Sequence, residues 1–304
     1  MPDGSGKPEI VRRAEAAAAE AAREAKTEVL AEVAARAPAR EARRPKAEIA
    51  AKADPWHRFV LDVWITNLNS VEFGFYKHSR NKAKSRQFTS DMDIFAEIIE
   101  DGERTGLIGY REDLWTKSTG MDKRLVLKLF GERLNWHATM DLMIGRSLQL
   151  TLGARGLPVV AYSANVGDHE HMVYLERSAN KWPFMPENFS FFLMEEGRPT
   201  FYRLKRRIID LGGDYVLIDH HNREIGAVDG RLLSIGGKWK GRILREHADK
   251  RLLIVLKLFC GMLIFNRSAK RHVSRLAADV LAGRYEPKLE KQEADLYMNP
   301  RRVR

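Results

Sequence analysis

Residues 252–265 read LLIVLKLFCGMLIF, and this stretch decides which fold the rest of the chain has to form. At about 1.5 Å per residue, a helix of this length spans roughly 21 Å, well short of the ~30 Å hydrocarbon core of a bilayer. The stretch is apolar on nearly every face, so a globular fold must surround it completely. We therefore predict a helix enclosed by other elements rather than a membrane span.

Short apolar segments bounded by Gly, Asn and Asp precede this helix, and two of them flank Asp101-Gly102, a dipeptide typical of hairpin turns. Short strands at such regular intervals indicate a β-sandwich or a barrel. The stretches 55–88 and 121–131 fit either helix or strand. The segments that we predict as strands are residues 94–99, 107–110, 147–152, 158–163, 171–175, 189–194, 200–211, 215–219, 224–228, 231–235 and 238–244.

A short internal repeat gives the arrangement of the last strands. Residues 207–215 read RIIDLGGDY, and residues 231–239 read RLLSIGGKW. Each copy predicts a strand, a tight turn whose glycines permit positive φ, and a second strand that begins at an aromatic residue. A hairpin that cannot bury its own apolar face must stack on its neighbours, which favours a closed sheet.

Residues 201–266 resemble the LURP-one-related family, which belongs with the phospholipid scramblases to the tubby C-terminal-like group. The likeness lies in residues 202–205 (YRLK), 211–219 (LGGDYVLID) and 228–236 (VDGRLLSIG), and in the apolar helix. It implies a closed twelve-stranded antiparallel barrel whose hydrophobic C-terminal helix threads the interior, with the earlier strands supplied by residues 89–200. No family residue for calcium, phosphoinositide or catalysis can be placed on this chain.

Composition and these patterns divide the chain into four parts. We expect a low-complexity Ala/Glu/Arg-rich tail, helical or disordered, at 1–54, and a connecting basic segment at 55–88. A mainly β barrel follows at 89–266, with its core helix at 249–266, and a basic helical extension occupies 267–304.

The composition excludes several classes of protein. A single cysteine, Cys260, rules out a disulfide framework and a cysteine-built zinc site. The N-terminus has no apolar region typical of a secretory signal, so we expect a cytoplasmic protein that can lie peripheral to the membrane. A formal net charge of +11 implies an anionic partner.

Catalytic and metal-binding motifs give little support to an enzyme, although the sequence leaves that question open. The chain has no GxSxG, no GxxxxGK(S/T) and no GxGxxG after a strand, so we assign no catalytic residue and expect no cofactor. His169 and His171 would face the same side of a strand and could share a metal with His220 or His221. No ligand motif of fixed spacing supports this, so we favour loop or surface histidines and assign no metal site.

Two of the predicted strands carry basic residues at every second position, which would place those side chains on the outer face of a barrel. The repeat suggests that strands 200–211 and 238–244 are neighbours, so we predict one basic patch. Each cation near an anionic bilayer contributes about 1 kcal/mol, so such a patch would hold the protein to lipid reversibly. The six candidate residues are Arg203, Lys205, Arg207, Lys238, Lys240 and Arg242.

The first reading is therefore a non-enzymatic barrel that binds anionic phospholipid headgroups, or another polyanion, through its basic face. One alternative is a scaffold or assembly subunit that binds protein partners through residues 1–54 and 267–304. A second alternative is a nucleic-acid-binding module that contacts phosphates through the same cations, although no RRM, KH or zinc-finger signature is present. A solvated basic surface without a ligand is the simplest remaining interpretation.

Overall fold

The computed structural model describes residues 54–63, 92–178, 187–207, 214–231 and 237–288, together with residues 291, 293 and 294. The chain separates into two units, Met1–Ala53 and Asp54–Arg304, and every described residue belongs to the second. The tail expected at 1–54 therefore lies almost entirely outside the described residues, as do residues 64–88 of the expected connecting segment.

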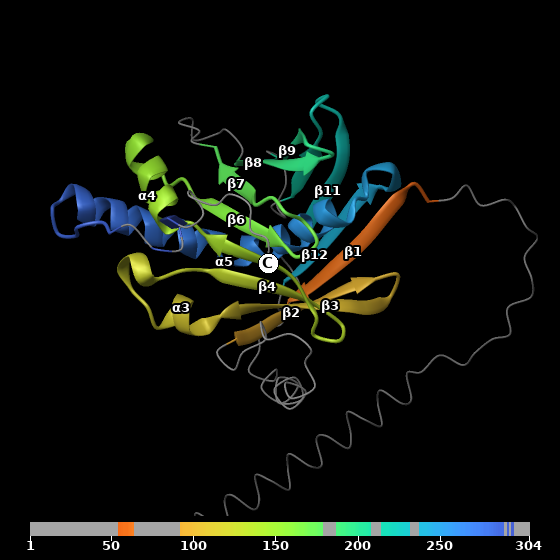
Figure 1. Ribbon diagram of the computed structural model, residues 1–304, viewed down its shortest axis with the longest axis horizontal. Coiled ribbons are helices and arrows are strands. Elements are labelled where there is room, and N and C mark those ends of the chain that lie inside the picture. Colours follow the sequence, from red (N-terminus) through yellow and green to blue (C-terminus); the bar gives the residue numbers. More distant parts are fainter. Residues whose placement is uncertain are drawn as a thin grey trace, which may run out of the picture. The chain divides into compact units, whose positions relative to one another are not determined.

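Twelve strands in the described part of the chain form a closed antiparallel barrel (Figure 1). Each strand pairs with the strands before and after it in sequence, and β1 closes the barrel by pairing with β12. The strands are β1 (Trp56–Val63), β2 (Met92–Glu100), β3 (Glu103–Arg111), β4 (Val126–Gly131), β5 (Trp136–Leu142), β6 (Ala161–Val166), β7 (Val173–Arg177), β8 (Asn188–Glu195), β9 (Arg198–Arg206), β10 (Tyr215–Ile218), β11 (Glu224–Arg231) and β12 (Lys238–Leu244).

The helix α5 (Lys250–Leu281) begins after the short 3₁₀ turn that follows the last strand, and its first half lies in the barrel interior. Asp249 caps it, since its Oδ1 accepts the backbone N–H groups of Arg251 at 2.8 Å and Leu252 at 3.3 Å. One hydrophobic core joins the buried face of α5 to inward side chains from all twelve strands. The enclosed helix and the closed barrel are thus confirmed.

The remaining helices are short and lie after strands β3 and β5. They are α3 (Glu112–Thr116) and α4 (Ile144–Gly153), with 3₁₀ turns at Gly120–Asp122 and Arg245–His247. Figure 1 shows α5 emerging from the barrel beside α4. The open stretch 121–131 resolves into the end of a 3₁₀ turn followed by β4.

Among the described residues, one helix, α5, has the length and hydropathy to cross a membrane, with a mean hydropathy of 1.7 in its most apolar window. The fold buries 67% of that window, which is the pattern of a soluble protein's core helix. This burial agrees with the expectation for α5, while the cytoplasmic location stays a prediction.

The hairpin predictions hold where the structure describes them. Asp101 and Gly102 have φ of 52° and 85° between β2 and β3, as a two-residue hairpin turn of this hand requires. The repeat also pairs strands correctly, because β9 pairs with β10 and β11 with β12. The turn residues 208–213 and 232–236, and with them most of the strand predicted at 231–235, lie outside the described residues.

Three expectations about element boundaries need correction. The barrel begins at β1, inside the expected connecting segment 55–88, because Phe59, Leu61 and Val63 alternate into the core. Residues 147–152 belong to α4 rather than to a strand, since Ile144 and Leu148 are buried at helical spacing. The core helix does not stop at residue 266.

Helix α5 continues without interruption through the first part of the extension expected at 267–304. Ala269, Val273, Leu276 and Ala277 are buried, and their spacing follows one face of the helix. Arg271 and Arg275 are exposed on the other side. Arg271 and Arg275, two of the basic residues that suggested a separate extension, therefore lie on the solvent face of a helix whose other face packs on the domain.

Candidate functional site

The predicted cations of β12 point away from the barrel interior. Gly241 and Ile243 are buried, whereas Lys240 and Arg242 between and beside them are exposed, as strand alternation requires. The side chain of Lys238 is 37% exposed and its Nζ lies 2.8 Å from Oδ2 of Asp62.

The cations of β9 also face outward. Tyr202 and Leu204 are buried in the core, and Arg203 and Lys205 occupy the alternate positions. Arg207 follows the last residue of the strand, and its guanidinium lies 3.4 Å from the carboxylate of Glu224. The outward orientation of the two sets is therefore confirmed.

The prediction that all six cations form one patch on neighbouring strands is wrong, because β10 and β11 lie between β9 and β12. At about 4.8 Å per strand, the two sets are roughly 14 Å apart along the wall. Val216 and Ala227 separate Lys205 from Arg242 in the cross-strand register. The repeat equates β9 with β11 and β10 with β12, so it does not support the expected pairing of β9 with β12, and that expectation is wrong.

The structure instead brings a cation from β1 to the cations of β12. Arg58 lies directly opposite Arg242 in the β1–β12 register, and Lys240 lies opposite Val60. We call Arg58, Lys240 and Arg242 the β1–β12 cation cluster. Like charges directly opposite one another on paired strands destabilise a sheet, so this arrangement has a cost in the absence of an anion.

The three cations of this cluster have few internal partners. Arg58 pairs at 3.1 Å with Asp54, and both side chains are largely exposed. The guanidinium of Arg242 lies 5.0 Å from the centre of the Trp56 ring. No residue in the described part of the chain forms an ion pair or hydrogen bond with the side chain of Lys240. Most of the charge thus faces solvent.

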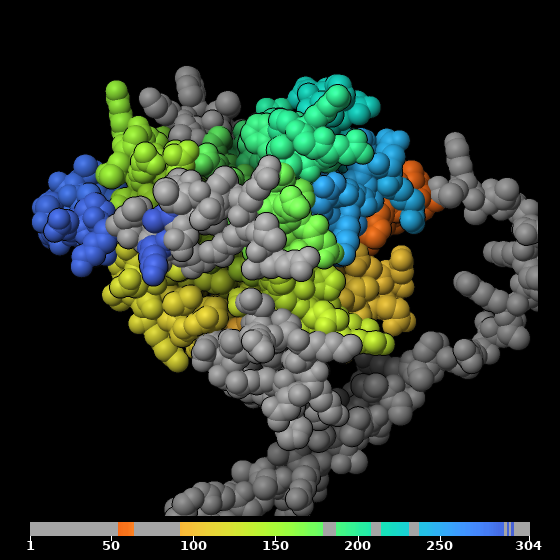
Figure 2. All heavy atoms as spheres, in the orientation of Figure 1, coloured from red at the N-terminus to blue at the C-terminus, as the bar shows by residue number. Residues whose placement is uncertain are grey.

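A surface cavity of about 480 Å³ adjoins the cluster. Arg58, Lys240 and Arg242 line it together with Asp229, which lies directly opposite Lys240 in the β11–β12 register, and Asp214 and Arg207 line the part nearer β10. Asp214 accepts the backbone N–H of Gly230 at 3.0 Å. Figure 2 shows β1 and β12 side by side at one end of the described part of the molecule. The cavity is therefore lined by four cations with two carboxylates among them.

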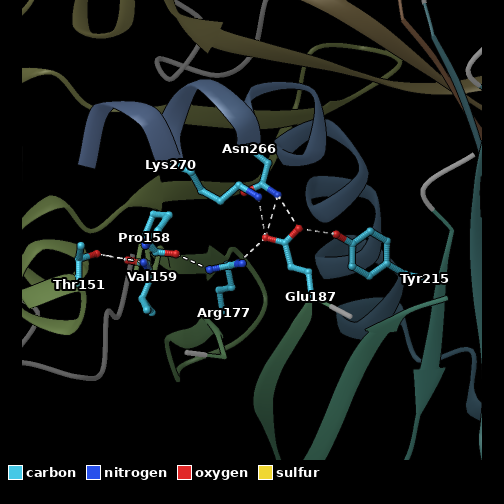
Figure 3. Close-up of polar contacts among 8 residues, drawn as sticks. All are labelled: Thr151, Pro158, Val159, Arg177, Glu187, Tyr215, Asn266 and Lys270. Carbon is cyan, nitrogen blue, oxygen red and sulfur yellow. Dashed lines mark hydrogen bonds and ion pairs between the residues drawn. The ribbon is translucent and has the colours of Figure 1, made fainter. Parts of the chain in front are cut away.

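A second polar cluster, inside the barrel, was not predicted from the sequence (Figure 3). Glu187 is 8% exposed, and its carboxylate contacts Arg177 Nε at 2.5 Å and Lys270 Nζ at 3.1 Å. Asn266 Nδ2 donates to both carboxylate oxygens at 3.3 Å, and the Tyr215 hydroxyl donates at 3.2 Å. We call these five residues the Glu187 cluster.

The electrostatics of the Glu187 cluster follow from one carboxylate between two cations. Burial alone would raise the pKa of Glu187, but the charges of Lys270 and Arg177 more than offset this and hold that pKa below its ordinary value. Arg177 also donates to the backbone carbonyl of Pro158. Through Glu187, these contacts connect the core helix α5 to strands β7 and β10 of the barrel. Lys270 was visible in sequence as part of a basic run, but nothing indicated its partner.

The histidines weighed as metal ligands do not lie in a regular strand. His169 and His171 precede β7, with ring centroids 5.8 Å apart, and burial lowers the pKa of His169. Within the described residues, no group of three or more His, Cys, Asp and Glu side chains is placed to hold a metal. Cys260 is fully buried, and burial raises the pKa of its thiol.

Comparison with protein-family models, curated proteins and solved structures found no match to this chain. The resemblance of residues 201–266 to the LURP-one-related family therefore stays a prediction. Functional inference depends on the geometry of the β1–β12 cation cluster and its cavity.

Proposed function

We propose that the barrel binds anionic phospholipid headgroups through the β1–β12 cation cluster and the adjoining cavity. One observation carries the proposal: Arg58 and Arg242 lie directly opposite each other, with Lys240 beside them, at the rim of a cavity of about 480 Å³. A cavity of this size is typical of small-molecule sites.

The chemistry of the cluster suits phosphate. Arginine binds phosphate oxygens with two parallel hydrogen bonds, and lysine adds a compact point charge. A bound phosphate would offset the repulsion between the two arginines, so binding removes a cost that the free barrel carries. Each cation near an anionic bilayer contributes about 1 kcal/mol, which corresponds to about five-fold in affinity.

The acidic side chains in the same cavity indicate which kind of headgroup would bind there. Asp229 of β11 lies directly opposite Lys240, two strands from Arg58, and Asp214 lies just before β10. A headgroup that carries a phosphate, a carboxylate and an ammonium, such as that of phosphatidylserine, complements four cations and two acids, whereas phosphatidylcholine lacks the second anionic group. A uniformly anionic polymer such as nucleic acid would meet these two carboxylates, which disfavours it.

Vesicle co-sedimentation tests the proposal. We expect the wild-type protein to sediment with phosphatidylcholine vesicles that contain phosphatidylserine, to remain in solution with phosphatidylcholine alone, and to dissociate as salt rises. Replacing Arg58, Lys240 and Arg242 by Glu should weaken sedimentation by at least about a hundred-fold, because each reversal removes a favourable charge and adds a repulsive one.

A matched control carries the same change in charge elsewhere. Lys117 follows α3, and Arg271 and Arg275 lie on the exposed face of α5, toward the opposite end of the domain from β1 and β12 (Figure 1). Their replacement by Glu should leave affinity within a few-fold. Equal losses in both variants would mean that net charge alone attracts the membrane, and undiminished binding by the cluster variant would overturn the proposal. A parallel titration with an oligonucleotide tests the nucleic-acid alternative.

A further inference from the structure

The outer wall formed by β8, β9 and β10 is unusually apolar. The outer face of an antiparallel barrel is ordinarily polar, because alternate residues meet water. Here the polar outward positions are Asn188, Ser190, Arg203 and Lys205. The apolar outward positions are Phe192, Met194, Pro199, Phe201, Val216 and Ile218, and we call them the β8–β10 apolar face.

An aromatic pair forms the most exposed part of this face. Phe192 of β8 lies directly opposite Phe201 of β9, with ring centroids 5.0 Å apart. The Phe192 residue is 54% exposed, and among the described residues only Leu281 is a more exposed large hydrophobic residue. Single exposed apolar residues are common, but a contiguous patch marks an interaction surface.

The positive charges beside the β8–β10 apolar face indicate which partner covers it. Arg203 and Lys205 follow Phe201 along the same outward side of β9, and no outward position of β8, β9 or β10 within the described residues is acidic. Arg203 donates to Asn222 Oδ1 at 2.9 Å, and no described residue pairs with the side chain of Lys205. Aromatic rings beside cations match the anionic interface of a bilayer, where rings enter the headgroup region and cations remain at the phosphates.

The register joins this face to the headgroup cavity. Lys205, Val216, Ala227 and Arg242 lie opposite one another in turn across β9, β10, β11 and β12. The apolar face and the cation cluster are thus parts of one continuous stretch of wall. A second copy of this chain is a poor occupant, because two faces that both carry Arg203 and Lys205 would repel each other.

We propose that the β8–β10 apolar face enters the interfacial region of an anionic bilayer, with Phe192 and Phe201 inserted between lipid headgroups. This proposal rests on the proposed lipid-binding function and adds that the ligand is a membrane surface rather than a free headgroup. Soluble phosphorylated compounds would fill the cavity but leave the aromatic pair in water.

An environment-sensitive fluorophore tests insertion directly. Phe192→Cys provides an exposed thiol for a nitrobenzoxadiazole label, while the native Cys260 is 0% exposed and stays unlabelled. We expect the label to brighten and shift to the blue on addition of phosphatidylserine-containing vesicles. The same label at Lys117→Cys, an exposed residue directly after α3 and outside the β8–β10 apolar face, should not change.

Affinity gives a second, independent measurement. Phe192→Ser should weaken vesicle binding about ten-fold without lowering the melting temperature, because the side chain is exposed in the free protein. Phe192→Trp should restore or strengthen binding, since tryptophan favours the membrane interface.

The outcomes separate the two proposals. Sedimentation without a change at the labelled position 192, and with full affinity in Phe192→Ser, would overturn insertion and leave the headgroup site intact. Absence of sedimentation in the wild type would overturn the proposed function, and insertion with it. A fluorescence change that follows protein concentration without vesicles, with dimers in gel filtration, would show that a second copy covers the face and would also overturn insertion.

Discussion

Lys257 of α5 donates a hydrogen bond from Nζ to Oε2 of Glu100 in β2 at 2.9 Å. Thr105 donates to the same carboxylate at 2.7 Å, and Nε2 of His57 lies 2.9 Å from it. Burial alone would raise the pKa of Glu100, but the Lys257 ammonium and these hydrogen bonds lower it below its ordinary value. Lys257, the only charged residue within the apolar stretch 252–265, thus binds the core helix to β2, as the Glu187 cluster binds it to β7 and β10.

Glu100→Gln should lower the free energy of unfolding by about 2 kcal/mol, because it leaves the mostly buried Lys257 ammonium without its counter-charge. Urea denaturation measures the change. The exposed carboxylate of Glu103 on the same hairpin offers a control, and Glu103→Gln should change stability by under about 0.5 kcal/mol. Adding Lys257→Met to Glu100→Gln should recover part of the loss, and a further loss instead would contradict the pairing.

Glu187 should make the fold sensitive to acid. Its pKa is lower in the folded protein than the ordinary value of 4.5, so its contribution is complete above that value and is lost as pH falls through the folded pKa. Glu187→Gln should therefore destabilise the protein at neutral pH, with a difference from wild type that shrinks below pH 4.5. Urea titrations at several pH values measure this, and a difference independent of pH would contradict it.

Leu256→Asp should prevent the domain from folding at room temperature. Leu256 is 2% exposed inside the barrel, and an unpaired charge in such a core costs several kcal/mol of a stability of about 5–15 kcal/mol. Leu281→Asp places the same substitution on the same helix at a residue that is 72% exposed, and it should fold normally. Circular dichroism and gel filtration compare them, and a folded Leu256→Asp variant would contradict the enclosed helix.

Asp229→Asn should change lipid preference rather than abolish binding. Asp229 is an exposed acid in the headgroup cavity, placed to meet the ammonium that phosphatidylserine carries and phosphatidylglycerol lacks. We expect the variant to bind phosphatidylglycerol vesicles about three-fold better and to lose part of its preference for phosphatidylserine at equal surface charge. Unchanged preference in co-sedimentation would show that the acids of the cavity do not contact the headgroup.

Much of this fold is readable from sequence because the decisive signals are local. Asp101-Gly102 marks a hairpin, and the alternation of β12 separates Gly241 and Ile243 inside from Lys240 and Arg242 outside. The helix at 252–265 is apolar on nearly every face, so other elements must enclose it in whatever order the strands are connected. These inferences use spacing along the chain, and the structure confirms them.

The missed elements have signals that compete with one another. In β1, the charged residues Arg58 and Asp62 alternate with Phe59, Leu61 and Val63, so a strand with a polar outer face resembles a basic connecting segment. In α4, residues 147–152 form a short segment between glycines, which is also the pattern of a strand, and they include the hydroxyl residues Ser147 and Thr151. Their hydroxyls instead bond to the backbone, with Ser147 Oγ donating to the Met143 carbonyl at 2.6 Å.

The candidate site was found only in part because it depends on which strands meet. Lys240 and Arg242 were identified as outward cations, but Arg58 joins them only through closure of the barrel, and closure has no local signature. Arg207 reaches the same cavity from the end of β9, whereas Arg203 and Lys205 lie beside the apolar face. Pairs distant in sequence, such as Glu187 and Lys270, are equally invisible before the fold is known.

The closure of β1 on β12 places the headgroup site across the seam where the first and last strands of the barrel meet. Arg58 and Arg242 come together only when that seam is shut, so a fluctuation that frees β1 would dismantle the site. A ligand that bridges the two strands would by mass action make such opening rarer. Hydrogen exchange of the β1 amides should therefore slow when lipid is bound, because the membrane would hold the first and last strands of the barrel together.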